Sequence, residues 1–421
     1  MYFEIAFEMK FEDYSINTAI KKSLNEMGFI RPTDIQYKAI PSILKGEDVL
    51  AVAQTGTGKT AAFAIPVIHL LQENKKNRRP DGVQCVVMVP THELAIQVTE
   101  VFQQIAQNTR VKTLSVFGGV DQDPQIAKLE DGVDIIIATP GRLFDLKSQG
   151  HLRLDRVKIL ILDEADHMLN LGFIKDIQEL IQALPRRRQT LFFSATIDKK
   201  IKKLAYSLVH DAIRIQISPK DPVAKNVNHN IAFIEMDHKR FFLEHAVTEN
   251  PESKILVFVR TKIRAERVMK AMGRVGIKSL TFHGDKEQSE RQAALNQFKA
   301  STIKVLIATD VSARGIDVPD VDFVVNYDLP DQAENYVHRV GRTGRGRKKG
   351  EAISFCSPEE KPLLADIESL IGHPIPVLEI DKMHYKDTLN IERDRNSDLE
   401  ALMRTVEEEK NWKKNRKKKR K

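Results

Sequence analysis

The stretch ILILDEADHM, from Ile159 to Met168, sets four aliphatic residues directly before three carboxylates that fall within four positions. The apolar run favours burial, and buried carboxylates are costly unless they are paired, hydrogen-bonded or near a metal. In open parallel sheets ligands bind at the carboxyl ends of the strands, and acids that follow a buried strand fit such a place. A helix N-cap cluster is the alternative for the acids taken alone.

The same alternation of short apolar runs and amphipathic segments continues along both halves of the chain. The first half contains DVLAVA from Asp48, CVVMVP from Cys85, TLSVFG from Thr113, DIIIATP from Asp134, KILILDEAD from Lys158 and TLFFSAT from Thr190. The second half contains KILVFV from Lys254, SLTFHG from Ser279, KVLIATD from Lys304, DFVVNYD from Asp322 and EAISFC from Glu351. Helix-length segments between such runs predict an α/β fold with mostly parallel sheets and helices on both faces.

The composition bounds the class of protein. A chain of 421 residues with 42% apolar and 29% charged residues fits two or three soluble globular domains. No apolar run approaches the roughly 18 to 20 residues of a membrane span. The acidic start MYFEIAFEMKFEDY lacks the basic region of a secretory signal. Cys85 and Cys356 lie far apart in apolar runs, which predicts buried, reduced thiols. We therefore expect a cytoplasmic protein without a membrane partner.

A phosphate-binding pattern, AQTGTGKT from Ala53 to Thr60, lies between the run DVLAVA and the next amphipathic segment. A phosphate loop has Gly, four residues and then Gly-Lys-Ser/Thr, and Ala53 takes the first Gly position here. Gly56 and Gly58 allow backbone N–H groups to turn around phosphate oxygens, and the following helix adds its dipole. Lys59 would neutralise the β- and γ-phosphates, and the Thr60 hydroxyl would ligate Mg²⁺. The pattern predicts a nucleoside triphosphate and Mg²⁺ site.

Ten motifs follow one another in an order that makes the chain resemble a DEAD-box ATP-dependent RNA helicase of superfamily 2. They are GFIRPTDIQ from Gly28, AQTGTGKT from Ala53, PTHELA from Pro90, GG at Gly118, TPGR from Thr139, DEAD from Asp163, SAT from Ser194, HGDKEQSER from His283, ATDVSARGID from Ala308 and HRVGRTGR from His338. The resemblance runs from about Phe11 to about Pro376 and is most like the bacterial RhlE-type subgroup. It implies two tandem RecA-like domains, with ATP and Mg²⁺ as cofactors.

The resemblance implies a role for each matching residue at the nucleotide. Gln36 would hydrogen-bond the adenine edge, Asp163 would hold Mg²⁺ through water, and Glu164 would position the attacking water. Arg342 and Arg345, in the second domain, would reach the γ-phosphate only when the two domains close. The implied ATP-binding set is Phe11, Phe29, Thr33, Gln36, Ala53, Gln54, Thr55, Gly56, Thr57, Gly58, Lys59, Thr60, Gly315, Asp317, Arg342 and Arg345. The implied metal-binding residues are Thr60 and Asp163. The implied catalytic residues are Lys59, Asp163, Glu164, Arg342 and Arg345.

The resemblance also implies residues that couple the domains and residues that line an RNA groove. The coupling residues would be Asp166, Ser194, Thr196 and His338. The RNA-binding residues would be Pro90, Thr91, Gly118, Gly119, Thr139, Pro140, Gly141, Arg142, Gln288, Arg291, Thr309 and Arg314. Such contacts go mainly to phosphates and 2′-hydroxyls, so they would select RNA by its backbone rather than its sequence.

One departure from the family pattern is His92, which stands in PTHELA where the usual motif is PTRELA. A largely neutral imidazole lacks the permanent charge and the planar fork that arginine offers to phosphate. We therefore expect the change His92→Arg to strengthen RNA binding modestly in the ATP-bound state.

The net charge of +8 comes from one end of the chain, because eight of the nine residues from Lys413 to Lys421 are basic. An RNA-tethering arm, a solubilising end and, in a eukaryotic source, a nuclear localisation signal all remain open for this run. Before it, Leu399, Leu402, Met403 and Val406 keep a helical spacing that predicts a short amphipathic helix.

These patterns predict five segments: an N-terminal extension over 1–10, an ATP-binding domain over 11–217, a linker over 218–230, a second RecA-like domain over 231–380, and a polar, basic and disordered tail over 381–421. MKFEDYSI from Met9 resembles the usual start of the first domain, so we expect the first eight residues to be dispensable or to precede the true start.

The leading interpretation is an enzyme that couples ATP hydrolysis to local, non-processive remodelling of RNA, in ribosome assembly or RNA turnover. A monomer with ribosome-assembly or RNA-decay proteins as partners is the expectation. The alternative is an ATP-gated RNA clamp or assembly factor in which strand separation is incidental. Glu164, Arg342 and Arg345 are intact, which favours retained hydrolysis.

Overall fold

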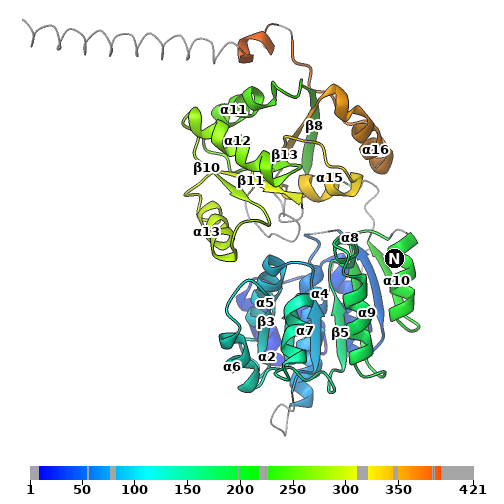
Figure 1. Cartoon of the computed structure of the whole chain (residues 1–421). Coiled ribbons are helices and arrows are strands. Elements are labelled where there is room, and N and C mark those ends of the chain that lie inside the picture. Colours follow the sequence, from blue (N-terminus) through cyan, green and yellow to red (C-terminus); the bar gives the residue numbers. More distant parts are fainter. Residues whose placement is uncertain are drawn as a thin grey trace, which may run out of the picture.

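The computed structural model describes residues 9–54, 56–75, 82–197, 199–217, 223, 226–310, 321–344, 349–381, 383 and 385–389. They form two α/β domains that lie one above the other in Figure 1, each built on a single sheet. Every pair of neighbouring strands in both sheets is parallel. The predicted fold class, two tandem RecA-like domains, is confirmed.

The first domain carries a seven-stranded sheet in the order β3-β4-β2-β5-β6-β1-β7. Its strands are β1 Val49–Ala53, β2 Cys85–Met88, β3 Thr113–Val116, β4 Ile135–Ala138, β5 Ile159–Leu162, β6 Gln189–Ser194 and β7 Ile213–Ile217. Its helices are η1 Phe11–Asp13, α2 Thr18–Glu26, α3 Asp34–Leu44, α4 Lys59–Asn74, α5 His92–Ala106, α6 Asp123–Glu130, α7 Pro140–Ser148, α8 Ala165–Asn170, α9 Ile174–Ala183 and α10 Lys199–Leu208. The six runs that the sequence analysis quoted from this half all form strands.

Apolar layers cover both faces of this sheet, which is why its central strands are continuous aliphatic runs rather than alternating ones. Along β5, Ile159 and Ile161 belong to the core on one face, and Leu160 and Leu162 belong to the core on the other. All four residues of β5 are buried. The acids that follow β5 are therefore held at the end of a strand that packing fixes on both sides.

The second domain carries a six-stranded sheet in the order β10-β11-β9-β12-β13-β8. Its strands are β8 Val227–Phe233, β9 Ile255–Val259, β10 Ser279–Phe282, β11 Val305–Thr309, β12 Phe323–Asn326 and β13 Gly350–Cys356. Its helices are α11 Lys239–Glu249, α12 Lys262–Arg274, α13 Gln288–Lys299, α15 Ala333–Val340, η2 Pro358–Glu360 and α16 Lys361–Ile371.

Two predicted boundaries of the second domain are wrong. Strand β8 begins at Val227, inside the predicted linker 218–230, and pairs with β13 along its whole length. The strand was missed because it lies at the sheet edge, where the sequence VNHNIAF leaves Asn228 exposed and Asn230 half-buried and resembles a polar loop. At the other end, Tyr385 lies in the predicted tail but packs against Phe242 of α11, with ring centroids 4.9 Å apart. The second domain therefore extends beyond residue 380.

Cys85 and Cys356 are buried free cysteines, which confirms the prediction of reduced thiols. Among the residues that the structure describes, no helix has the length and apolar character needed to cross a membrane. The predicted amphipathic helix around Leu399 and the basic run from Lys413 lie outside the described residues.

Candidate active site

Strand order divides the carboxyl edge of the first sheet into two halves. The phosphate loop follows β1, the DEAD acids follow β5 and the SAT motif follows β6, and these three strands are neighbours. The GG, TPGR and PTHELA motifs follow β3, β4 and β2, which are also neighbours. The predicted nucleotide residues and the predicted RNA residues therefore occupy adjoining parts of one edge, as expected for ligand sites of a parallel sheet.

The phosphate loop is shaped around its glycines. Gly56 has a φ of +80° and Gly58 has a φ of +91°, a region that other residues seldom adopt. The Thr57 hydroxyl closes the loop by donating to the Gln54 carbonyl oxygen at 2.8 Å. Ala53 ends β1, and Thr60 lies in the first turn of α4. Thr55 lies outside the described residues.

Lys59, the first residue of α4, supplies the strongest sign of a ligand. Its side chain is buried, and its Nζ has no hydrogen-bond partner among the residues that the structure describes. A buried ammonium without a partner is costly. An anion at the start of α4 would remove that cost, and a triphosphate fits the loop, the lysine and the helix N-terminus together.

Asp163 and Glu164 lie directly beyond β5 and are both buried. The Glu164 backbone N–H donates to Asp163 Oδ1 at 3.0 Å. Burial raises the pKa of the Asp163 carboxyl to about 6, although the nearby Lys59 charge acts in the opposite direction. Glu164 has a φ of +51°, so its backbone is held in the left-handed region at the start of α8. Such strain persists where the surrounding structure demands it, and it is often found at functional sites.

Three neighbouring side chains favour the ionised form of Glu164. Burial alone would raise its pKa, but His167, Lys59 and Arg342 together lower it to about 2. His167 Nδ1 lies 3.5 Å from Glu164 Oε2. Arg342 belongs to the second domain, so its effect on Glu164 means that the two domains face each other across the acid.

The predicted metal residues Thr60 and Asp163 fit Mg²⁺ because both offer oxygen ligands beside the phosphate loop. No group of three or more His, Cys, Asp or Glu side chains among the described residues could hold a metal by itself. Mg²⁺ usually binds through one or two carboxylates plus substrate phosphates, so such a cluster is not required.

The predicted coupling residues of the first domain form one hydrogen-bonded group. Asp166 Oδ2 accepts from both the backbone N–H and the hydroxyl of Thr196, each at 3.2 Å. The Ser194 hydroxyl donates to the Thr196 carbonyl oxygen at 2.7 Å. The DEAD acids after β5 and the SAT motif after β6 are thus joined. His338 lies in the second domain on α15, where its carbonyl oxygen accepts from Arg342 Nε at 3.1 Å.

Of the predicted adenine residues, Thr33 and Gln36 lie beside the phosphate loop. Phe11 and Phe29 stack with ring centroids 6.1 Å apart. Gln36 is buried, accepts from the Thr33 backbone N–H at 2.9 Å, and donates from Nε2 to the Gly58 carbonyl oxygen at 3.1 Å. The amide of Gln36 therefore joins the predicted adenine loop to the phosphate loop.

The second domain presents Arg342 just after α15, and that helix is anchored by a buried arginine. Arg339 Nη2 donates to Asp310 Oδ2 at 2.8 Å, and its Nη1 donates to the Asp328 carbonyl oxygen at 2.6 Å. These bonds fix α15 to the ends of β11 and β12. The predicted residues Arg314, Gly315, Asp317 and Arg345 lie outside the described residues.

The predicted RNA residues of the first domain lie at loop ends and helix starts. Thr91 is the N-cap of α5 and accepts from the Leu94 N–H, and Pro90 precedes it. Thr139 is the N-cap of α7, which contains Pro140, Gly141 and Arg142. Gly118 and Gly119 follow β3. The exposed N–H groups of helix starts are suited to bind phosphate oxygens.

Side chains of the second domain meet this RNA half directly. Gln288 and Arg291 lie on α13, and Thr309 ends β11. Gln288 Oε1 lies 3.4 Å from His92 Nδ1. Arg291 Nε lies 3.4 Å from Glu93 Oε1. The structure therefore brings residues 196 and more positions apart in sequence to one place.

Several residues at this site were missed by the sequence analysis. His167 is three positions after Glu164 within the quoted run, a spacing that places both on one side of a helical turn. Glu93 follows His92 in PTHELA, and the sequence analysis assigned it no role. Asp310 and Arg339, which anchor α15, lie within the quoted motifs ATDVSARGID and HRVGRTGR, but the spacing of the motifs does not show that the two side chains pair.

Comparison with known proteins supports the same functional class. The model of the DEAD/DEAH box helicase family matches residues 33–204, and that of the helicase conserved C-terminal domain matches residues 238–347. The ATP-dependent RNA helicase CshA of Listeria monocytogenes is 41% identical over 359 residues, which cover 85% of this chain and 68% of that protein. RhlB of Shewanella frigidimarina is 40% identical over 380 residues, which cover 89% of this chain and 87% of that protein.

Two solved structures bear on the arrangement of the domains. Yeast Dbp5 bound to RNA and ADP BeF3 matches with a TM-score of 0.81 at 28% identity, covering 91% of this chain and 99% of that one. A DEAD box protein from Methanococcus jannaschii is more similar in sequence, at 38%, but has a TM-score of only 0.51 while covering 88% and 99%. The domains of this chain are therefore arranged more like those of the RNA-bound yeast protein.

Proposed function

This chain belongs to the DEAD-box ATP-dependent RNA helicases, RNA-stimulated ATPases that use ATP with Mg²⁺, and from that membership we propose how its residues share the work. ATP binds at the phosphate loop of the first domain, RNA binds across both domains, and closure of the domains completes the hydrolysis site. The observation that carries this proposal is the position of Arg342, close enough across the domain boundary to lower the pKa of Glu164.

In the proposed mechanism the chain's own groups bind, orient and neutralise. Lys59 and the N-terminus of α4 neutralise phosphate charge, and Glu164, ionised and held by its strained backbone, orients the attacking water. Arg342 adds charge stabilisation only in the closed arrangement, where an arginine finger contributes roughly 10³- to 10⁵-fold in rate. Thr60 and Asp163 would hold Mg²⁺, which when bound would supply charge neutralisation at the phosphates. The group formed by Asp166, Ser194 and Thr196 transmits the state of the acids to the domain boundary.

On the RNA side, we propose that Pro90, Thr91, Gly118, Gly119, Thr139, Pro140, Gly141, Arg142, Gln288, Arg291 and Thr309 contact the RNA backbone. Because these residues come from both domains, closure would bend a bound strand and destabilise a short duplex locally. We further propose a cytoplasmic monomer that acts in ribosome assembly or RNA turnover and that lies nearest the RhlE-type subgroup. In the clamp alternative, the same closure would hold RNA without separating strands.

Trapping of the closed state tests the proposal. Glu164→Gln keeps the shape of the side chain and removes the charge that orients water, so the variant should bind ATP and RNA and remain closed. We expect crosslinking to recover much more RNA with Glu164→Gln than with Lys59→Ala, which should not bind ATP. Arg342→Ala should lower the RNA-stimulated ATPase rate by at least about 10³-fold, whereas Arg186→Ala, in an exposed loop of the first domain, should not. Equal RNA recovery from Glu164→Gln and Lys59→Ala would contradict the mechanism.

A further inference from the structure

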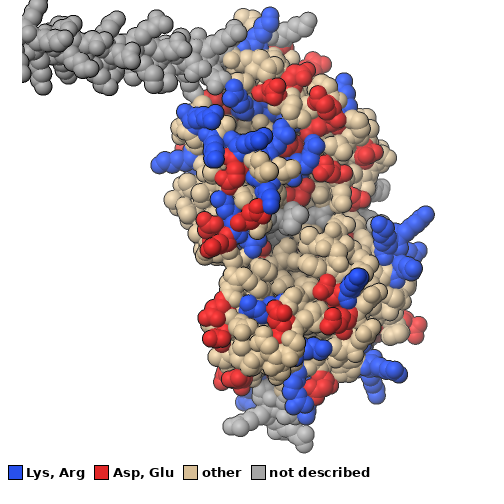
Figure 2. All heavy atoms as spheres, viewed as in Figure 1, with Lys and Arg blue, Asp and Glu red and all other residues tan. Residues whose placement is uncertain are grey.

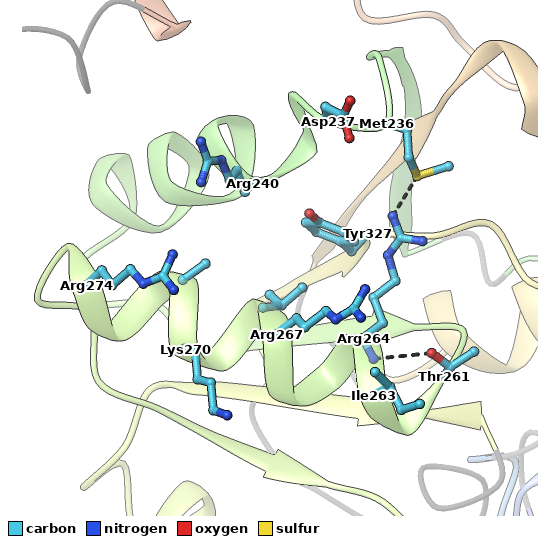
Figure 3. A pocket seen from close by; sticks show the side chains of 12 residues that line it. Met236, Asp237, Arg240, Thr261, Ile263, Arg264, Arg267, Lys270, Arg274 and Tyr327 are labelled. Carbon is cyan, nitrogen blue, oxygen red and sulfur yellow. Dashed lines mark hydrogen bonds between the residues drawn. The ribbon is translucent and has the colours of Figure 1, made fainter.

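A cavity of about 630 Å³ lies between α11 and α12 of the second domain, apart from the ATP and RNA residues described above. Figure 3 shows its lining, with Tyr327 and Met236 toward the interior and Arg240, Arg267, Lys270 and Arg274 along the two helices. Figure 2 shows lysine and arginine side chains gathered on the face that these helices form. The helicase mechanism above assigns nothing to this basic pocket.

The basic pocket carries cations that the rest of the fold does not neutralise. Five of its lining residues are Arg or Lys, and Asp237 is the single acid among them. Arg264 already forms an ion pair, because its Nε lies 3.2 Å from Asp328 Oδ1. Arg267, Lys270 and Arg274 are exposed and form no hydrogen bond or ion pair with any residue in the part of the chain that is described. The pocket therefore suits an acidic ligand.

The apolar part of the lining narrows the class of ligand. Val268, Ala271 and Met236 contribute aliphatic or thioether surface, and Ile263 at the rim is 60% exposed. A ligand that covers these groups needs apolar side chains as well as acids. Single-stranded RNA fits less well, since it binds by stacking bases on exposed rings and Tyr327 is only 5% exposed. An acidic amphipathic peptide meets both requirements.

The chain itself leads to the edge of this pocket. The Tyr385 hydroxyl accepts from the Glu235 backbone N–H at 3.2 Å and lies 3.0 Å from His238 Nδ1. Glu235 directly precedes the lining residues Met236 and Asp237. The described chain ends four residues later, at 389. Whatever follows residue 389 is thus tethered beside α11.

We infer that residues 398–409, with the sequence DLEALMRTVEEE, bind in the basic pocket of the same chain. This segment has five acids and one base, and its acids complement the three cations of the pocket that lack a partner among the described residues, Arg267, Lys270 and Arg274. Leu399, Leu402, Met403 and Val406 recur at helical spacing and supply the apolar face. As a helix the twelve residues would span about 18 Å, close to the roughly 20 Å of α12, at 1.5 Å per residue.

The tether makes binding within one chain favourable. The eight residues 390–397 reach up to about 30 Å when extended, enough to cross the two helices. A short flexible tether gives an effective concentration of roughly millimolar, so even a weak intrinsic affinity keeps the segment bound. Docking would also fix the start of the basic run Lys413–Lys421 against the second domain.

Trp412, the single tryptophan, lies three positions after the segment and reports on it without labelling. We expect acrylamide to quench Trp412 fluorescence at least about twofold less in the full chain than in the triple variant Arg267→Glu, Lys270→Glu, Arg274→Glu. The matched control Arg186→Glu, Arg187→Glu reverses charge on an exposed loop of the first domain and should quench like the unmodified chain. A synthetic peptide of residues 396–411, which lacks tryptophan, should raise quenching by competition.

A second variant with exchanged charges tests the inference even if the triple variant is poorly folded. Adding Glu407→Arg, Glu408→Arg and Glu409→Arg to it should restore protection, because each new pair is again of opposite sign. Equal quenching in the full chain and the triple variant overturns the inference. Protection that grows with protein concentration assigns the pocket to a second copy, and loss of RNA affinity with unchanged quenching assigns it to RNA; both results also overturn it.

Discussion

Arg291 of the second domain reaches Glu93 of the first, with Nε 3.4 Å from Oε1, and both side chains are largely shielded from water. The pair exists only while the domains face each other, so it links RNA-side contacts to closure. Because the neighbouring His92 and Gln288 also meet across this boundary, the proposed RNA contacts and the observed interdomain contacts involve the same few residues. Changes here should alter how readily RNA promotes closure rather than the chemistry at Glu164.

We expect Arg291→Ala to raise the KM for RNA in the ATPase reaction about tenfold and to leave kcat at saturating RNA nearly unchanged. A tenfold change corresponds to about 1.4 kcal/mol, which is below the roughly 2 to 5 kcal/mol for loss of one partner of a fully buried charge pair because Arg291 is partly exposed. The control is Glu93→Gln, which breaks the pair but keeps Arg291 for RNA. A normal KM in Glu93→Gln would mean that Arg291 acts through RNA alone.

The effect of His92→Arg on RNA binding remains a prediction, and the structure shows which side chains surround His92. The His92 ring lies 5.5 Å from the Phe117 ring and meets Gln288 and Arg291. Arginine would bring a permanent charge and a planar fork toward phosphate, so RNA affinity with a non-hydrolysable ATP analogue should rise about two- to fivefold. Titration of labelled RNA by fluorescence anisotropy measures it. An unchanged or weaker RNA affinity of His92→Arg would contradict the prediction.

Closure should weaken as the pH falls below about 6.5, the ordinary pKa of histidine. Burial lowers the pKa of the His92 imidazole, with Arg291 and Arg142 acting in the same direction and Glu93 and the Gln288 hydrogen bond opposing them. The closed state then binds fewer protons than the open state at His92. Between pH 6.5 and the lowered pKa, each unit by which the pH falls should raise the KM for RNA by at most about tenfold. Above pH 6.5 this contribution should be constant. In His92→Gln the KM for RNA should lose this dependence; an unaltered pH profile would exclude His92 as its source.

The buried strands and the motifs at their ends could be predicted from the sequence, whereas the contacts between the two domains could not. Strands buried on both faces require continuous aliphatic runs, so β1, β5 and β9 stand out, whereas the edge strand β8 alternates with polar residues and was missed. Spacing places each motif at a strand end but gives no distance between domains. The proximity of Arg291 to Glu93, and of Tyr385 to α11, depends on packing between segments far apart in sequence.

Gly58 lies so close to Gln36 that one added methyl group should disrupt the contact between the predicted adenine loop and the phosphate loop. A Cβ at Gly58 would lie 2.5 Å from Gln36 Nε2 and 3.2 Å from Thr33 Oγ1, and Gln36 is held by hydrogen bonds on both sides. Gly58→Ala should therefore raise the KM for ATP at least about tenfold, since backbone strain of roughly 1 to 3 kcal/mol adds to the overlap.

Gly46→Ala is the matched control for this substitution. Gly46 has a similar φ of +81°, but a Cβ there meets nothing within 4 Å, so the backbone strain is reproduced without the overlap. It should lower the melting temperature slightly and leave the KM for ATP unchanged. The double variant Gln36→Ala, Gly58→Ala should bind ATP about as weakly as Gln36→Ala alone if overlap with Gln36 is the main cause. A much weaker double variant would instead assign the defect to strain in the phosphate loop.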